Sequence, residues 1–84
     1  MNDLRQVFGA NLRRLREHKR LSQRDLAGKA GVNRSYISRL ENGANYAGLE
    51  IIGKMASVLG VEPADLLKQL PACNQAMAAT FRLD

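Results

Sequence analysis

The chain has 84 residues, which allows one small domain and a tail. Thirteen Lys and Arg residues against eight Asp and Glu give a formal net charge of +5. No stretch approaches the ~20 apolar residues of a membrane span, and the basic N-terminal segment lacks a signal-peptide core. Cys73 is the single cysteine, so an internal disulfide is excluded and we expect a reduced, cytoplasmic setting.

The positive charge is concentrated in the N-terminal half of the chain. Residues 1–39 carry ten basic and three acidic side chains, a net charge of +7, whereas residues 40–84 have a net charge of −2. This asymmetry is typical of a protein whose N-terminal half faces a polyanion. The alternative is a basic surface without a partner, and charge alone favours nucleic acid only slightly.

The first two helices are predicted from helical spacing and from their ends. Residues 3–20 form the first, capped by Asn2 or Asp3, and residues 23–30 form the second. Ser22 and Asp25 have the spacing of a capping box, and Gly31 suits the left-handed residue that ends a helix. Gly9 weakens the first helix by about 1 kcal/mol relative to Ala. The apolar faces comprise Leu4, Val7, Phe8, Leu12 and Leu15, then Leu26, Ala27 and Ala30.

Three further helices follow. The third covers residues 33–42, with Asn33 as N-cap, Ile37 and Leu40 inward and Gly43 as its stop. The fourth covers residues 49–59, and the fifth begins at Pro63, after Glu62 as cap, and is closed by Pro71. Residues 71–84 form a tail that is a short helix, a dimerisation arm or frayed chain. The apolar residues expected here are Leu49, Ile52, Met55, Ala56 and Leu59, then Leu66, Leu67 and Leu70. The prediction is an all-α domain over residues 1–70.

Burying Ile37 and Leu40 leaves the polar side chains of the third helix exposed near its start. A helix that lies in the major groove presents such residues to base edges. Arg pairs in bidentate fashion with guanine O6 and N7, and Asn pairs with adenine. The alternative is the ordinary polar face of a bundle helix. The exposed set is Asn33, Arg34, Ser35, Ser38 and Arg39.

The pattern L-S-Q-x-x-L-A-x-x-A-G-V followed by Y-I-S-x-L-E-N-G covers residues 21–43. It resembles the Xre/Cro-type phage-repressor helix-turn-helix family, including the controller proteins of restriction–modification systems. The resemblance extends over about residues 4–70 and implies a five-helix, lambda-repressor-like fold that binds operator DNA as a homodimer. It identifies Arg34, Ser35 and Arg39 as base-reading positions, with Asn33 assisting.

The same resemblance implies contacts with backbone phosphates. The family's helix-2 glutamine corresponds to Gln23, at a helix start whose free N–H groups favour a phosphate. The loop of residues 44–48 departs from the family pattern, which often has a basic residue followed by proline. The expected phosphate contacts are Ser22, Gln23, Tyr36, Ser38, Asn42, Asn45 and Tyr46.

Arg16 and Glu41 match the family's internal ion pair between the first and third helices, so we assign them to structure. His18 has no neighbouring ligand cluster, and we expect neither a metal nor a cofactor. Cys73 has no partner histidine, so we expect an inert thiol. Several residues have two interpretations. Arg13, Arg14, Lys19 and Arg20 flank phosphates or form a solvated face, and Leu66, Leu67, Leu70, Met77 and Phe81 are core or a dimer patch.

The leading hypothesis is a sequence-specific transcriptional regulator that reads a partly symmetric operator in double-stranded DNA as a homodimer. A protein-interaction module, an antitoxin or anti-activator that binds through the tail after Pro71, is the alternative. An enzyme has almost no support, because no acid–base pair or activated nucleophile is visible. We expect no small-molecule effector and no membrane association.

Overall fold

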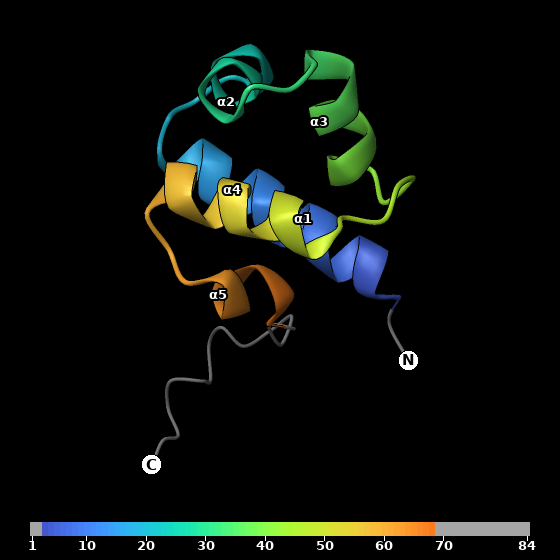
Figure 1. Ribbon diagram of the computed structural model, residues 1–84. Helices are drawn as coiled ribbons and strands as arrows, with labels where there is room; N and C mark the ends of the chain where they lie inside the picture. The colour runs from blue at the N-terminus through green and yellow to red at the C-terminus, as the bar shows by residue number, and fades with distance from the viewer. Residues whose placement is uncertain (1–2, 69–84) are drawn as a thin grey trace.

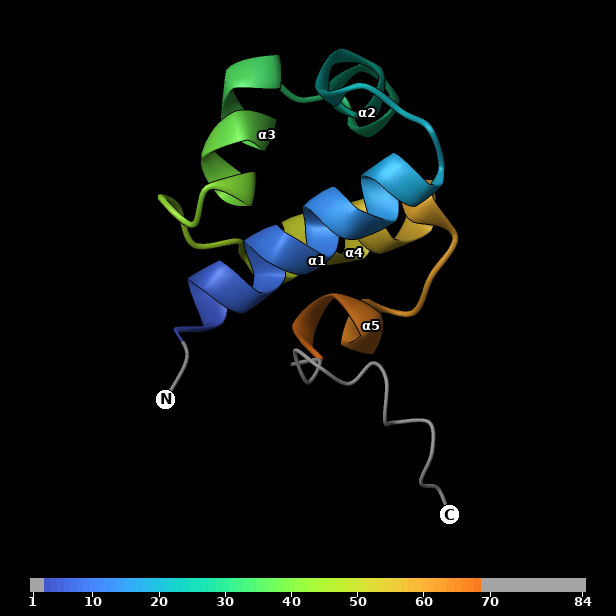
Figure 2. The same cartoon turned by 180° about the vertical axis from the view of Figure 1, so that it is seen from behind.

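The computed structural model describes residues 3–68, and within them the chain forms helices and no strand. The five helices are α1 (Leu4–His18), α2 (Gln23–Ala30), α3 (Arg34–Glu41), α4 (Leu49–Leu59) and α5 (Pro63–Leu67). α1 and α4 lie side by side in the middle, with α2 and α3 on one side of them and α5 on the other (Figures 1 and 2). The all-α prediction is confirmed. The predicted boundary near residue 70 and the tail of residues 71–84 lie outside the described residues.

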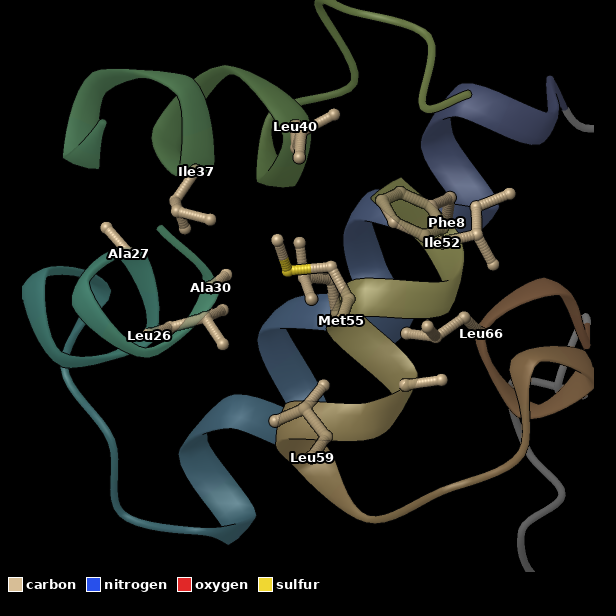
Figure 3. Close-up of a cluster of buried hydrophobic side chains, with 12 residues drawn as sticks. Phe8, Leu26, Ala27, Ala30, Ile37, Leu40, Ile52, Met55, Leu59 and Leu66 are labelled. Atoms are coloured by element: carbon tan, nitrogen blue, oxygen red, sulfur yellow. The ribbon is translucent and has the colours of Figure 1, made fainter. Parts of the chain in front are cut away.

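The core lies between the two central helices and the three around them. Met55 of α4 lies near its centre, with side chains from α2 and α3 on one side and Leu66 of α5 on the other (Figure 3). Burial of each large apolar side chain contributes about 1.5–3 kcal/mol. The side chains without any solvent exposure are Leu12, Leu26, Ile37, Leu40, Met55, Leu59 and Leu66.

Three leucines on the predicted apolar faces are exposed. Leu4 is 61% exposed, Leu49 is 88% exposed and Leu67 is 38% exposed. Leu4 and Leu49 are the first residues of their helices, where no other described element covers them. Leu4 and Leu67 instead line one apolar groove, together with Phe8, Tyr46, Ala47, Ile52 and the side chain of Arg5. Helical spacing identifies a face, but not how far along it the neighbouring helices reach.

The first and last helices end earlier than predicted. α1 stops at His18 because Arg20 takes a left-handed conformation, with φ of 60°, and the N–H of Leu21 donates to the carbonyl of Arg16. At the end of α5 the backbone of Lys68 is already extended. The buried amide of Asn11 donates to the carbonyls of Leu66 at 2.9 Å and Lys68 at 2.7 Å. A side chain of α1 therefore satisfies carbonyls that another helical turn would have used.

The backbone of α1 lies close against the C-terminal end of α3 at Gly9. A Cβ atom at this position would lie 2.5 Å from the carbonyl oxygen of Leu40 and 2.7 Å from that of Glu41. A residue with a side chain does not fit where the two backbones meet, so Gly9 has a packing role. This role explains why the helix has a glycine here although glycine lowers helix propensity. The contact lies at the C-terminal end of α3.

Candidate DNA-binding surface

The helix-turn-helix consists of α2, α3 and a three-residue connection. Gly31 takes the predicted left-handed conformation, with φ of 72°, and the half-buried Val32 packs against the core. Ile37 and Leu40 are buried as predicted, so α3 turns Asn33, Arg34, Ser35 and Arg39 toward solvent, with Ser38 half-buried. The exposed polar face predicted from the sequence is present.

The two helix starts differ in how they are capped. The Ser22 hydroxyl accepts from the N–H of Asp25 at 2.9 Å, and the Asp25 carboxylate accepts from the N–H of Ser22 at 3.1 Å. The predicted capping box is confirmed, and its hydrogen bonds hold the pKa of Asp25 below the usual value. Asn33 occupies the N-cap position of α3, but its side chain makes no capping hydrogen bond. The prediction that Asn33 caps α3 through its side chain is therefore wrong.

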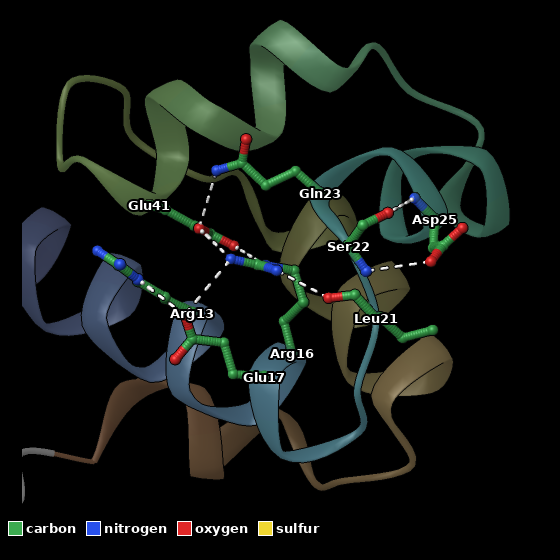
Figure 4. A network of polar contacts seen from close by, with 8 residues as sticks. All are labelled: Arg13, Arg16, Glu17, Leu21, Ser22, Gln23, Asp25 and Glu41. Atoms are coloured by element: carbon green, nitrogen blue, oxygen red, sulfur yellow. Dashed lines mark hydrogen bonds and ion pairs between the residues drawn. The ribbon is translucent and has the colours of Figure 1, made fainter.

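Arg16 and Glu41 form the predicted ion pair between α1 and α3 (Figure 4). Arg16 Nε and Nη2 donate to the two carboxylate oxygens of Glu41 at 2.6 and 3.1 Å, and Nη1 donates to the carbonyl of Leu21 at 2.7 Å. The Glu41 side chain is 3% exposed, and the hydrogen bonds to it raise the pKa of the Arg16 guanidinium. This bidentate geometry fixes the end of α3 against α1 and the chain before α2.

Gln23 joins the same network, which the sequence did not indicate. Its Nε2 donates to Glu41 Oε1 at 3.1 Å, so the side-chain amide points along α3 (Figure 4). One N–H of the amide remains for an outside partner. Gln23 therefore links α2 to α3, and a phosphate contact would use the second N–H.

α3 ends in a tight turn that brings the following loop back beside Arg39. The N–H of Gly43 donates to the carbonyl of Leu40 at 3.2 Å, and the N–H of Ala44 donates to that of Arg39 at 2.9 Å. With Gly43 left-handed, this is a Schellman motif. The Asn45 amide, oriented so that both its atoms are satisfied, accepts from Arg39 Nε at 3.2 Å and donates to the Ala44 carbonyl at 3.1 Å.

The aromatic candidates have cationic neighbours. The Arg39 guanidinium lies 6.0 Å from the ring centroid of Tyr36. Arg5 lies over the ring of Tyr46 at 4.6 Å, and its guanidinium also pairs with Asp3 at 2.7 Å. Tyr46 is 72% exposed, and its ring lines the apolar groove. The contact with Arg5 could not be found from the sequence, because the two residues are distant along the chain and follow no motif spacing.

The remaining candidates are more isolated. Asn42 is exposed at the C-cap of α3. Arg13 pairs with Glu17 at 3.2 Å on the exposed face of α1, and His18 is exposed. Residues 3–68 contain no group of three or more His, Cys, Asp or Glu side chains that could hold a metal ion, and no helix in this range is both long and apolar enough to cross a membrane. Cys73, Met77 and Phe81 lie outside the described residues.

Comparisons with known proteins agree with this architecture. A family model described as a helix-turn-helix domain matches residues 7–70. Control protein C.BamHI from Bacillus amyloliquefaciens is 40% identical over 67 residues, which are 79% of this chain and 83% of that protein. The solved restriction–modification controller protein C.AhdI from Aeromonas hydrophila is 42% identical, with a TM-score of 0.71 over 74% of this chain and 94% of that one.

A third relative was solved together with its nucleic acid. The biofilm master regulator SinR in complex with DNA is 32% identical, with a TM-score of 0.70 over 73% of this chain and 98% of that one. The family match covers α2 to α5 and α1 from residue 7 onward. This chain therefore belongs to the Xre/Cro-type helix-turn-helix family of DNA-binding transcriptional regulators, which includes restriction–modification controllers.

Proposed function

We propose that this protein binds a partly symmetric operator as a homodimer, with α3 of each copy in the major groove. The observation that carries the proposal is the exposed start of α3. Asn33, Arg34 and Ser35 face solvent there, while Glu41 and the turn after it hold the opposite end against α1. A helix that is held at its C-terminal end can enter the major groove with its N-terminal residues at the base edges.

In this proposal Arg34 and Arg39 supply most of the sequence discrimination. Each guanidinium can fork onto guanine O6 and N7, while Ser35 and Asn33 contact neighbouring bases. Within the described residues Arg34 makes no ion pair or side-chain hydrogen bond, so its fork is available. Phosphate contacts position the helix and supply affinity without reading sequence. We assign them to Ser22, Gln23, Tyr36, Ser38, Asn42 and Tyr46. Asn45, which the sequence also predicts as a phosphate contact, has Arg39 as its partner instead.

The homodimer follows from how such helices read DNA. One α3 spans a single half-site, so a symmetric operator needs a second copy whose helix enters the groove about 34 Å away. Exposed apolar residues supply a surface for that contact. Leu4, Tyr46 and Leu67 are exposed and line one groove on the side of α4 and α5, and such patches are typical of protein contact sites.

Selection of bound sites from a random DNA library tests the proposal. We expect a partly symmetric site with half-sites one helical turn apart, and sedimentation should give a mass of two chains per operator. Arg34→Ala should weaken the selected site by about 1–3 kcal/mol and relax the preference at one base pair. Equal losses on selected and random DNA would contradict base reading by Arg34, and the absence of any enriched site would contradict the proposed function.

A further inference from the structure

The geometry points to Asn45 as a positioning residue that orients the Arg39 guanidinium for base reading. Three hydrogen bonds close a ring through the end of α3 and the loop. The Arg39 carbonyl accepts from the N–H of Ala44 at 2.9 Å. The Ala44 carbonyl accepts from the Asn45 amide at 3.1 Å, and the Asn45 oxygen accepts from Arg39 Nε at 3.2 Å. Backbone and side chain of Arg39 are thus held by the same loop.

The backbone turn places Asn45 for this contact. Gly43, with φ of 76°, reverses the chain after α3 and forms the Schellman motif with Arg39 and Leu40. Its left-handed conformation is one that residues with a side chain rarely adopt. The hydrogen-bonded turn at the end of α3 therefore determines where Asn45 lies. The Arg39 guanidinium also lies within cation–π range of Tyr36, at 6.0 Å from its ring centroid.

The hydrogen bond also determines which part of the guanidinium is left for DNA. Arginine has five N–H donors, one on Nε and two on each Nη. Asn45 takes the Nε donor and leaves both Nη groups, which can fork onto guanine O6 and N7 from the end of the side chain. Within the described residues no side-chain hydrogen bond holds the Arg34 guanidinium. We therefore expect the Arg39 side chain to be more ordered than that of Arg34 before DNA binds.

Asn45 was expected to contact a phosphate, and the geometry assigns it a different task. Oriented so that both its atoms are satisfied, the half-buried amide accepts from Arg39 and donates one of its two N–H groups to Ala44. A residue that orients Arg39 affects one base pair, whereas a phosphate contact affects all sequences alike. The inference rests on the proposed function, because orientation of Arg39 matters for recognition only if Arg39 reads a base.

The first measurement uses the free protein. In nitrogen-15 relaxation experiments the Arg39 Nε–H should be ordered in the wild type and mobile in Asn45→Ala. Asn45→Asp keeps an oxygen acceptor and should preserve the order. Asn42→Ala removes a nearby asparagine whose side chain is not hydrogen-bonded to Arg39 and should also preserve the order. An equally mobile Nε–H in the wild type and in Asn45→Ala would overturn the inference, whether or not the protein reads DNA as proposed.

The second measurement uses the selected operator and a copy altered at the base pair whose preference depends on Arg39. Asn45→Ala should reduce discrimination between them by about 3- to 10-fold, as expected for loss of one hydrogen bond, and leave affinity for random DNA nearly unchanged. In an Arg39→Ala background Asn45→Ala should cause no further loss of discrimination. Asn45→Asp should retain discrimination, although its added charge weakens binding to every sequence.

Two results would overturn the assignment of Asn45 to Arg39. Equal losses on selected and random DNA would make Asn45 a phosphate contact, which is the pattern expected for Asn42→Ala. Loss of discrimination that persists in the Arg39→Ala background would make Asn45 a base-reading residue itself. Failure of the proposed function has a different signature, since the wild type would then show no preferred site while the Nε–H measurement still reports on the Arg39–Asn45 contact.

Discussion

The helices α2 and α3 form one motif but are stabilised at opposite ends. The start of α2 is closed by its own side chains, since Ser22 and Asp25 exchange two hydrogen bonds. The start of α3 has no side-chain cap. The end of α3, by contrast, has the Glu41 ion pair, the Schellman turn and the close contact at Gly9.

The difference shows that α3 can be anchored at its C-terminal end while its first N–H groups stay accessible. The first N–H groups of a helix need partners, and a cap supplies them at a gain of about 1 kcal/mol. α3 lacks the side-chain cap, and its contacts with α1 lie about two turns away. Its start thus remains open to water or, in the proposed complex, to DNA.

Glu41→Ala should have the largest effect, because it removes the anchor of α3. It removes both hydrogen bonds between the Arg16 guanidinium, whose side chain is 11% exposed, and a carboxylate, and leaves the longer contact with the exposed Glu17 at 3.9 Å. Breaking a buried pair in this way costs about 3–5 kcal/mol, measured here by urea denaturation. Glu41→Gln keeps an oxygen acceptor for Arg16 and should lose less. A loss below about 1 kcal/mol for Glu41→Ala would mean that the pair behaves like a surface salt bridge.

Gly9→Ala should be next, with a loss of about 1–3 kcal/mol, because the new methyl group meets backbone carbonyls at the end of α3. Helix propensity alone predicts the opposite sign, a gain of about 1 kcal/mol. Gly53→Ala is the matched control. Gly53 also lies inside a helix, but a Cβ there would meet nothing within 4 Å. In thermal unfolding, Gly9→Ala should lower the melting temperature and Gly53→Ala should raise it. A Gly9→Ala variant more stable than the wild type would show that the two backbones do not meet closely at this position.

The sequence predicted the features that depend on neighbours along the chain. The capping box at Ser22, the left-handed Gly31 and the buried Ile37 follow from local spacing and residue type, and all three are confirmed. The Arg16–Glu41 pair was available only through the family resemblance, because the two residues are 25 positions apart.

Features that depend on two distant segments were missed. Gly9 looked like a weak point of α1, since nothing in the sequence indicates that α3 passes over it. Gln23 and Asn45 carry amides whose direction depends on which partner the folded chain brings near, and each found one on α3. Asn11 is a buried polar residue whose partners are the carbonyls of Leu66 in α5 and of Lys68 just after it. Residue types alone do not show such pairings.

A smaller effect compares the two helix starts directly. Ser22→Ala removes a side-chain acceptor from the N–H of Asp25 and should lower the free energy of unfolding by about 1 kcal/mol. Asn33→Ala removes a side chain that makes no cap and should stay within about 0.5 kcal/mol of the wild type. Both are measured by urea denaturation in the same buffer. Equal losses for the two variants would show that Asn33 does cap α3 in solution.

The smallest effect is a pH dependence at the start of α2. The backbone and side-chain hydrogen bonds with Ser22 lower the pKa of the Asp25 carboxyl in the folded state, with a further contribution from Lys29 and Arg24. A lowered folded-state pKa means that this interaction stabilises the protein above the unfolded-state value near 4 and is lost as the pH falls through the folded-state value. Asp25→Asn keeps an oxygen acceptor but does not ionise.

The difference in unfolding free energy between the wild type and Asp25→Asn should therefore be constant from pH 7 to about 5 and shrink below about 4. Asp3 and Asp65, whose pKa values are also lowered, are present in both proteins and cancel in the difference. Since Asp25 is exposed, added salt should weaken the contribution of Lys29 and Arg24 but leave the hydrogen bonds with Ser22. Parallel curves down to pH 3 would mean that the charge of Asp25 adds nothing to the start of α2, and that a neutral oxygen acceptor at this position serves as well.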